Sequence, residues 1–205
     1  MVNGFHRGLK ETGFSEGRNV AVEYRWAEGQ YDRLPALAAE LVRHPVAVLV
    51  ASGITAARAA QASTATIPIV FNTGGDPVRL GLVNSLNKPD RNLTGVATFG
   101  KVLVAKQMEL LNELVPQAEA IAFLLNPNNA ATETEIDDVE AAAGALGQKL
   151  IIVKVRTEGE FDATFATIIR RRAGALLMQT DPFFNSRRDL IVALAAQHAV
   201  PTLSP

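Results

Sequence analysis

Four short polar segments hold the side chains of this sequence that are best suited to binding a small polar molecule. They are residues 52–55, 72–76, 126–129 and 180–182. Backbone N–H groups at a helix start after Ser52 can hold a carboxylate or another anion. Asp76 and Asp181 can pair with an ammonium group, and Asn72, Asn128 and Thr180 add neutral donors and acceptors. This combination fits a small zwitterion or a polar organic solute.

Each of these segments also has a purely structural explanation. Asp76-Pro77 and Asp181-Pro182 match a helix N-cap followed by proline at the first helical position, and Asn126-Pro127 is similar. Gly74 and Gly75 would let the turn before Asp76 bring its backbone close to a ligand. Capping and ligand binding are compatible, so both interpretations stay open.

The polar segments follow short apolar strands that alternate with helices along the whole sequence. Apolar spacing predicts strands at residues 19–27, 46–52, 67–71, 93–97, 120–126, 149–155, 174–180 and 200–204. It predicts helices at residues 2–12, 31–43, 54–63, 78–86, 101–115, 132–146, 158–172 and 183–199. The strand at 46–52 is a continuous apolar run, of the type that is buried on both faces. Such alternation indicates an α/β fold with parallel sheets.

Two stretches of similar build indicate two doubly wound lobes. Residues 46–71 and 174–204 each read as a buried strand, a polar loop, an alanine-rich helix and a short strand. We expect an N-terminal lobe at residues 1–97 and a C-terminal lobe at 98–205, with a crossing near 95–100. Because ligands bind at the carboxyl ends of parallel strands, facing lobes would bring all four polar segments to one cleft.

Composition argues against several classes of protein. The 205 residues carry a formal net charge of −1, which provides no electrostatic basis for binding nucleic acid. There is no cysteine, so disulfides and thiolate metal sites are excluded, and we expect neither a metal nor a cofactor. No histidine falls in the four polar segments, and no catalytic motif of the common hydrolase or nucleotide-binding types occurs. These observations disfavour an enzyme.

Longer motifs resemble a family of bacterial ABC-transporter substrate-binding proteins, similar to its tryptophan- and tyrosine-type members. The most specific stretch is IPIVFNTGGDPVRLGLVNSLNKPDRNLTGV. The resemblance continues through GLKETGFSEGRNVAVEYRWAEGQYDRLPALAAELV, GKVLVAKQMELLNELVPQAEAIAFLLNPNN and TDPFFNSRRDLIVALAAQHAVPTLSP, and so covers nearly all of the sequence. It implies a type I periplasmic-binding fold that closes around a solute and delivers it to a membrane permease. The family's ligand loops fall on Ser52, Gly53, Thr55, Asn72, Asp76, Asn126, Thr180 and Asp181.

The sequence departs from that family at both ends. The resemblance implies a first strand before residue 5 and a return segment after residue 205, and both are missing here, as is a signal peptide. We therefore expect a periplasmic protein by resemblance, or a cytoplasmic one if this is the whole gene product, with self-association through exposed strand edges. Two alternatives remain: a shortened remnant that does not bind a solute, and a cytosolic α/β enzyme. The aromatic residues nearest the expected cleft are Phe71, Phe99, Phe183 and Phe184.

Overall fold

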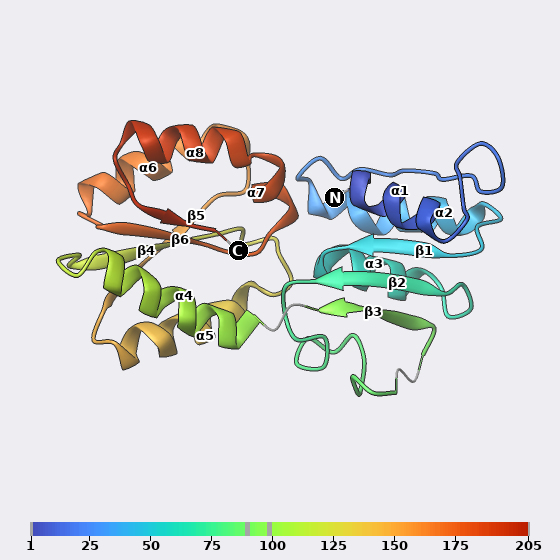
Figure 1. The fold of residues 1–205 in the computed structure, drawn as a ribbon, viewed down its shortest axis with the longest axis horizontal. Helices are drawn as coiled ribbons and strands as arrows, with labels where there is room; N and C mark the ends of the chain where they lie inside the picture. Colours follow the sequence, from blue (N-terminus) through green and yellow to red (C-terminus); the bar gives the residue numbers. More distant parts are fainter. Residues whose placement is uncertain (1, 89–90, 98–99, 205) are drawn as a thin grey trace.

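The protein folds into two α/β lobes that lie side by side, each built on a parallel sheet (Figure 1). The computed structural model describes residues 2–88, 91–97 and 100–204. In the first sheet the strands β1 (Leu49–Ser52), β2 (Ile69–Thr73) and β3 (Leu93–Ala97) are ordered β1-β2-β3. In the second, β4 (Ala120–Leu125), β5 (Lys149–Lys154), β6 (Ala175–Met178) and β7 (Thr202–Leu203) are ordered β5-β4-β6-β7. The expectation of a two-lobed parallel α/β fold is confirmed, whereas the lobe limits at 97 and 98 remain a prediction.

The second sheet carries helices on both faces (Figure 1). Helices α4 (Gly100–Leu114) and α5 (Thr132–Ala145) lie on one face. Helices α6 (Phe161–Arg170), α7 (Pro182–Ser186) and α8 (Arg188–Gln197) lie on the other, with a 3-10 turn at Glu158–Glu160 leading into α6. Every residue of β4 and β6 is buried, as the continuous apolar runs predict for strands covered from both sides.

The first sheet is covered on one face only among the described residues. Helix α3 (Ile54–Ser63) packs on the face that carries Leu49 and Ala51, and α2 (Leu34–Arg43) packs against α3. On the other face Val50 is 56% exposed, and Val70 and Val96 are exposed as well. The expectation that residues 46–52 form a strand buried on both faces is therefore wrong, because an apolar run does not by itself supply the second covering layer.

The segment at residues 19–27 does not form the predicted strand. It has one isolated bridge, between Glu16 and Val20, and it follows the helix α1 (Val2–Glu11) without joining either sheet. Side chains anchor it instead: Tyr24 Oη lies 2.6 Å from His6 Nε2, and Arg25 Nε donates to Glu40 Oε1 at 2.9 Å. Alternating apolar residues need a neighbouring strand to form a ladder, and none pairs with this segment.

Two predicted helices also differ from the structure. Residues 77–81 form a turn in place of a helix at 78–86, and Gly81 ends it with a φ of +69°. The helix expected at 183–199 is divided at Arg187 into α7 and α8. Helix α2 is preceded by a 3-10 turn at Tyr31–Arg33, and the remaining elements agree with expectation to within a few residues. The crossing between lobes runs from the end of β3 at Ala97 to the start of α4 at Gly100, and residues 98–99 lie outside the described part of the chain.

Candidate functional site

In the first lobe, two adjacent strands end together and place their last polar residues side by side. Ser52 ends β1 and pairs in register with Asn72 of β2. The backbone N–H of Gly53 lies 3.0 Å from the Asn72 carbonyl oxygen and 3.1 Å from Asn72 Oδ1. Gly53 has a φ of +88°, which lets the chain turn directly from the strand into α3. Asn72 therefore holds the start of α3 at the carboxyl edge of the sheet.

In the second lobe, a network of side-chain amides holds the corresponding loops. Asn129 Nδ2 donates to Asp181 Oδ2 at 2.8 Å, and Asn129 Oδ1 accepts from the N–H of Ala131 at 2.9 Å. Gln179 Oε1 accepts from the N–H of Asn126 at 2.8 Å. The loop of residues 126–131 is thus hydrogen-bonded to the loop that follows β6, and the two loops form one connected edge.

The two edges touch each other. Tyr31 Oη donates to Asp181 Oδ1 at 2.9 Å, and the N–H of Ala130 donates to Thr55 Oγ1 at 3.1 Å. A Cβ added to Gly74 would lie only 2.4 Å from Thr180 Cγ2. The strand-end loops of the lobes therefore meet without a gap at these points, and the lobes are in a closed arrangement.

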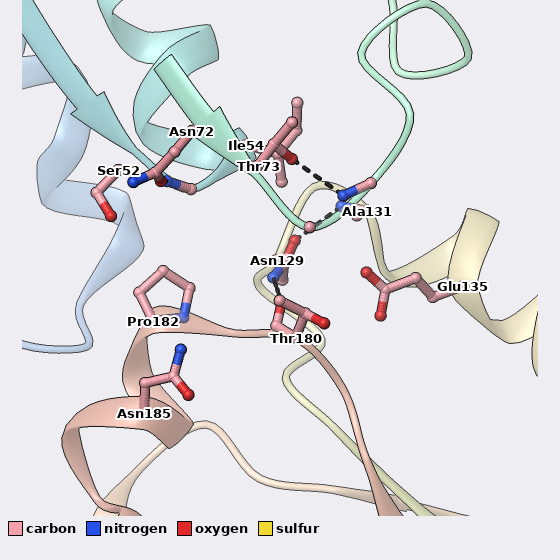
Figure 2. A pocket seen from close by; sticks show the side chains of 13 residues that line it. Ser52, Ile54, Asn72, Thr73, Asn129, Ala131, Glu135, Thr180, Pro182 and Asn185 are labelled. Carbon is pink, nitrogen blue, oxygen red and sulfur yellow. Dashed lines mark hydrogen bonds between the residues drawn. The ribbon is translucent and has the colours of Figure 1, made fainter. Parts of the chain in front are cut away.

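A small cavity of about 60 Å³ lies where these loops meet. Figure 2 shows its side chains arriving from both lobes, with Ser52, Asn72 and Thr73 on one side and Thr180, Pro182 and Asn185 on the other. Asn129, Ala131 and Glu135 close the remaining side, where Glu135 reaches in from α5.

A larger cavity of about 240 Å³ adjoins the small one and shares Gly74, Gly75, Ala131, Glu135 and Thr180 with it. Its apolar lining comes from both lobes and consists of Leu80, Leu103, Val104, Phe123, Leu177 and Met178. Its charged lining consists of Asp76, Arg79, Glu135 and Asp138. Arg79 Nη1 and Asp138 Oδ2 form an ion pair at 2.7 Å that joins the lobes at the rim. The site thus combines a polar end with a mainly apolar chamber.

Glu135 lies at the junction of the two cavities, in the first two turns of α5. The pKa of its carboxyl is raised to about 8, chiefly by burial, and the neighbouring carboxylates of Asp181 and Asp138 contribute to this rise. A hydrogen bond with the Gln179 side chain acts in the opposite direction. Glu135 is therefore an acid that holds its proton far more tightly than a surface glutamate does.

Asp181 is fully buried, and both oxygens of its carboxylate accept hydrogen bonds from other residues of the protein. It accepts hydrogen bonds from Tyr31, from Asn129 and from the N–H of Phe183, where it caps α7 as its sequence position predicts. Burial raises its pKa, and these hydrogen bonds oppose that effect. Asn126 is also fully buried; its amide is close enough to lower the pKa of Asp181, but Asn126 Nδ2 has no partner within hydrogen-bond distance. Asp181 is thus placed to hold the loops together.

The structure brings most of the sequence-predicted residues to the two cavities. Six line the smaller cavity, and they are Ser52, Gly53, Asn72, Gly74, Gly75 and Thr180. Asp76 lines the larger one, and its Oδ1 also accepts from the N–H groups of Val78 and Arg79, so it caps a turn in place of the expected helix.

The other predicted residues lie outside both linings. Thr55, Asn126, Asn128 and Asp181 support the loops, with the N–H of Asn128 bonded to Asn126 Oδ1 at 3.0 Å. Of the aromatic candidates, Phe71, Phe183 and Phe184 are buried in the lobe cores, and Phe99 lies outside the described residues. The apolar lining comes from other positions.

Sequence reasoning missed several residues that line the site. Asn129 belongs to the predicted polar segment 126–129, in which the sequence favours Asn128 as the ligand-binding residue. Glu135 and Asn185 lie on helices. In the sequence, a polar residue of a helix that lines a site looks the same as one that faces solvent. No signal in the sequence distinguishes them, because only the packing of the lobes decides which helical faces meet. Among the described residues, no three His, Asp or Glu side chains gather in a way that could hold a metal ion.

Two α/β lobes with a polar and apolar site between them define a bilobed binding protein of the type I periplasmic-binding fold. The chain belongs to the ABC transporter substrate binding protein family, whose model matches residues 1–204. It is 23% identical over 201 residues to a tyrosine-binding protein of Clostridioides difficile. That match covers 98% of this chain, and the chain spans 57% of the relative's length.

Solved structures agree with this fold. A conserved domain protein from Vibrio cholerae has a TM-score of 0.88 and 27% identity, covering 98% of this chain and 67% of that one. An ABC domain from Streptococcus pneumonia, solved in complex with L-Trp, has a TM-score of 0.84 and 22% identity with the same two coverages. Within the part of the chain that the structure describes, no helix has the length and apolar character needed to span a bilayer.

Proposed function

We propose that this protein binds a small amino-acid-like solute between its lobes, as the solute-binding component of a bacterial ABC importer. The observation that carries the proposal is that strand-end loops of both lobes line the same two adjoining cavities. A ligand held there would contact both lobes at once and would stabilise their closed arrangement. The relative named a tyrosine-binding protein and the neighbour solved with L-Trp support amino acids as the first solutes to test.

The proposed mechanism is closure without chemistry. The interlobe contacts of Tyr31 with Asp181 and of Thr55 with Ala130 form only when the lobes meet. A solute that contacts both edges adds its binding energy to these contacts, so the closed population rises with solute concentration. The closed form would then be the one that a permease recognises.

An enzymatic function is the less favoured alternative. The ionisable groups that line the two cavities in the described part of the chain are three carboxylates and one guanidinium, and the guanidinium is already paired. No histidine is among the described residues of either lining, so the usual base of a serine or threonine nucleophile is not found there and the lining favours recognition over turnover. Steady conversion of any solute by the purified protein would contradict the proposal.

A second alternative is a protein of this family that folds without binding a solute. The chain spans only part of its curated relative, and one face of its first sheet is uncovered among the described residues. Ligand-dependent stabilisation separates this alternative from the proposal, because only a protein with a working site gains stability from a solute.

The test is a thermal-unfolding screen with L-Tyr, L-Trp and a panel of other amino acids, followed by calorimetry. At a solute concentration 100 times the dissociation constant, we expect about 2.7 kcal/mol of stabilisation. Thr180→Val removes the hydroxyl of a residue that lines both cavities and should weaken binding by about tenfold. Thr167→Val is the matched control, because the Thr167 hydroxyl bonds to Ala163 on the exposed side of α6. Failure of every solute to stabilise the protein would overturn the proposal.

The remaining proposals concern location and partners. We propose that the protein works outside the cytoplasmic membrane with an ABC permease, as its family does. The exposed valines Val50, Val70 and Val96 on the first sheet also favour self-association, together with the open strand edges. Sedimentation or light scattering tests this, and a monomer at all concentrations would count against it.

A further inference from the structure

Glu135 stands out in the site because of where its charge lies. It is the sole ionisable residue in the described lining of the smaller cavity, where the other polar groups are amides and hydroxyls. It also lines the larger cavity, so its carboxyl faces any molecule that occupies either space. Figure 2 shows the side chain extending from α5 toward Asn129 and Thr180, into the region where the lobes meet.

The one cation in the described lining of the two cavities already has a carboxylate partner. Arg79 comes from the turn after β2 and forms its ion pair with Asp138 of α5, at 2.7 Å. None of the ion pairs found among the described residues includes Glu135. The acids whose charges act on it are Asp181 in the loop after β6 and Asp138 on its own helix, and Asp76 in the turn after β2 lines the same larger cavity. The site therefore has an excess of carboxyl groups over cations.

The larger cavity defines what else the ligand must have. Most of its lining is apolar and extends away from Glu135 along β4, β6 and α4. An apolar body would fill this chamber and gain from leaving water, while a charged group at one end reached Glu135. A carboxyl group placed at the junction would instead meet a second carboxyl.

We propose that Glu135 is the counter-ion for a protonated amine of the solute, and that it selects amines with an apolar body over the corresponding acids. This inference rests on the proposed solute-binding function and names the chemical group that this function recognises. Opposite charges in a partly buried site attract strongly, whereas an amide at the same position would provide only a neutral acceptor.

A proton balance follows from the same arrangement. In the unoccupied protein the pKa of Glu135 is about 8, so at neutral pH its carboxyl is mostly protonated. An ammonium group beside it favours the carboxylate, so binding transfers the Glu135 proton to the buffer while the amine keeps its own. Affinity for amines should therefore increase as the pH rises toward 8, up to the point where the solute amine loses its proton.

The experiment compares three probes with the same ring system: L-Trp, tryptamine and indole-3-propionate. Calorimetry in phosphate and in Tris at pH 7 measures affinity and, from the difference in apparent enthalpy, the protons released. We expect L-Trp and tryptamine to bind and to release a proton, and indole-3-propionate to bind at least about tenfold more weakly. Glu135→Gln should lose about tenfold in affinity for the two amines and should release no proton.

The matched control is Glu133→Gln, which removes a carboxylate from the same end of α5 at an exposed position outside both cavity linings. It should bind all three probes as the parent protein does. If the parent binds indole-3-propionate as well as tryptamine, or if Glu135→Gln binds amines unchanged, the inference is overturned while the solute-binding function stands. If neither these probes nor any solute of the wider screen binds, the inference and the proposed solute-binding function are both overturned. Circular dichroism of each variant establishes that it is folded.

Discussion

The hydroxyl of Tyr31 lies 2.9 Å from Oδ1 and 3.0 Å from Oδ2 of Asp181, and so joins two residues that are 150 positions apart in the sequence. Tyr31 stands at the start of the 3-10 turn before α2, and Asp181 caps α7 in the other lobe. Burial raises the pKa of Tyr31 above its ordinary value, and the negative charge of Asp181 and the hydrogen bond to it raise this pKa as well. One partly buried hydrogen bond thus links the closed arrangement of the lobes to a helix cap.

Removing this hydroxyl should open the lobes. In Tyr31→Phe, Asp181 keeps its bonds from Asn129 and from the N–H of Phe183 but loses the contact that crosses the cleft. We expect a loss of about 1–2 kcal/mol in the free energy of unfolding and a larger radius of gyration by small-angle X-ray scattering. Tyr24→Phe is the control, because its hydroxyl bonds to His6 within the first lobe. Equal scattering curves for the two variants would contradict the role of Tyr31 in closure.

Stability of the unliganded protein should fall as the pH rises. The pKa of Glu135 is about 8 against an ordinary value of 4.5, and that of Asp181 is raised as well. A carboxyl with a raised pKa binds more protons in the folded state, so its contribution is present below the unfolded pKa and is lost as the pH rises through the folded value. Urea unfolding between pH 5 and pH 9 measures this loss.

The pH effect can be assigned to one residue by substitution. Glu135→Gln should flatten the decline in unfolding free energy and should be more stable than the parent protein at pH 9, by roughly 1 kcal/mol or 2–4 °C in Tm. Glu133→Gln, at an exposed position of the same helix, should retain the parent's pH profile. A Glu135→Gln profile that still falls as steeply would assign the effect to other groups.

Gly74 should be intolerant of even one added carbon atom. Its backbone passes so close to Thr180 that a Cβ would lie 2.4 Å from Cγ2 and 2.7 Å from Cβ of that residue. Gly74→Ala should therefore hold the lobes apart and abolish the stabilisation by solute, with little change in secondary structure. Gly144→Ala, inside α5 with no atom within 4 Å of the added carbon, should instead stabilise the protein by up to about 1 kcal/mol. Thermal unfolding with and without solute compares the two, and an undiminished solute effect in Gly74→Ala would contradict this prediction.

The ion pair at the rim should contribute more than a surface ion pair does. Arg79 Nη1 contacts both carboxylate oxygens of Asp138, whose side chain is only 9% exposed. Arg79→Met should cost about 1–3 kcal/mol because it leaves that carboxylate without its partner. Lys106→Met breaks a pair with Glu109 that is exposed and lies within α4, and should cost clearly less than Arg79→Met does. Chemical denaturation measures the loss in the free energy of unfolding for both variants. Similar losses would show that the interlobe pair stabilises the protein no more than an exposed ion pair does.

The sequence predicted those parts of the fold that depend on local periodicity. The apolar runs of β4 and β6 and the helix of residues 54–63 appear where their spacing indicates, because burial on both faces and a 3.6-residue stripe leave direct marks in the sequence. The prediction of a strand at residues 19–27 is wrong for the opposite reason. Its alternation is real, but a strand also requires a partner, and pairing depends on residues far away in the chain.

For the candidate site, the sequence by itself determined that polar loops follow the strands of both lobes, since parallel strands end at one edge of a sheet. Ser52, Asn72 and Thr180 are predicted in this way, and all three line the smaller cavity. Only the tertiary structure decided that Asp181 accepts a hydrogen bond from Tyr31 and that Glu135 lines the cavities. The physical reason is that strand-end positions follow from local chain geometry, whereas the meeting of a helix face with a loop of the other lobe depends on how the two lobes pack.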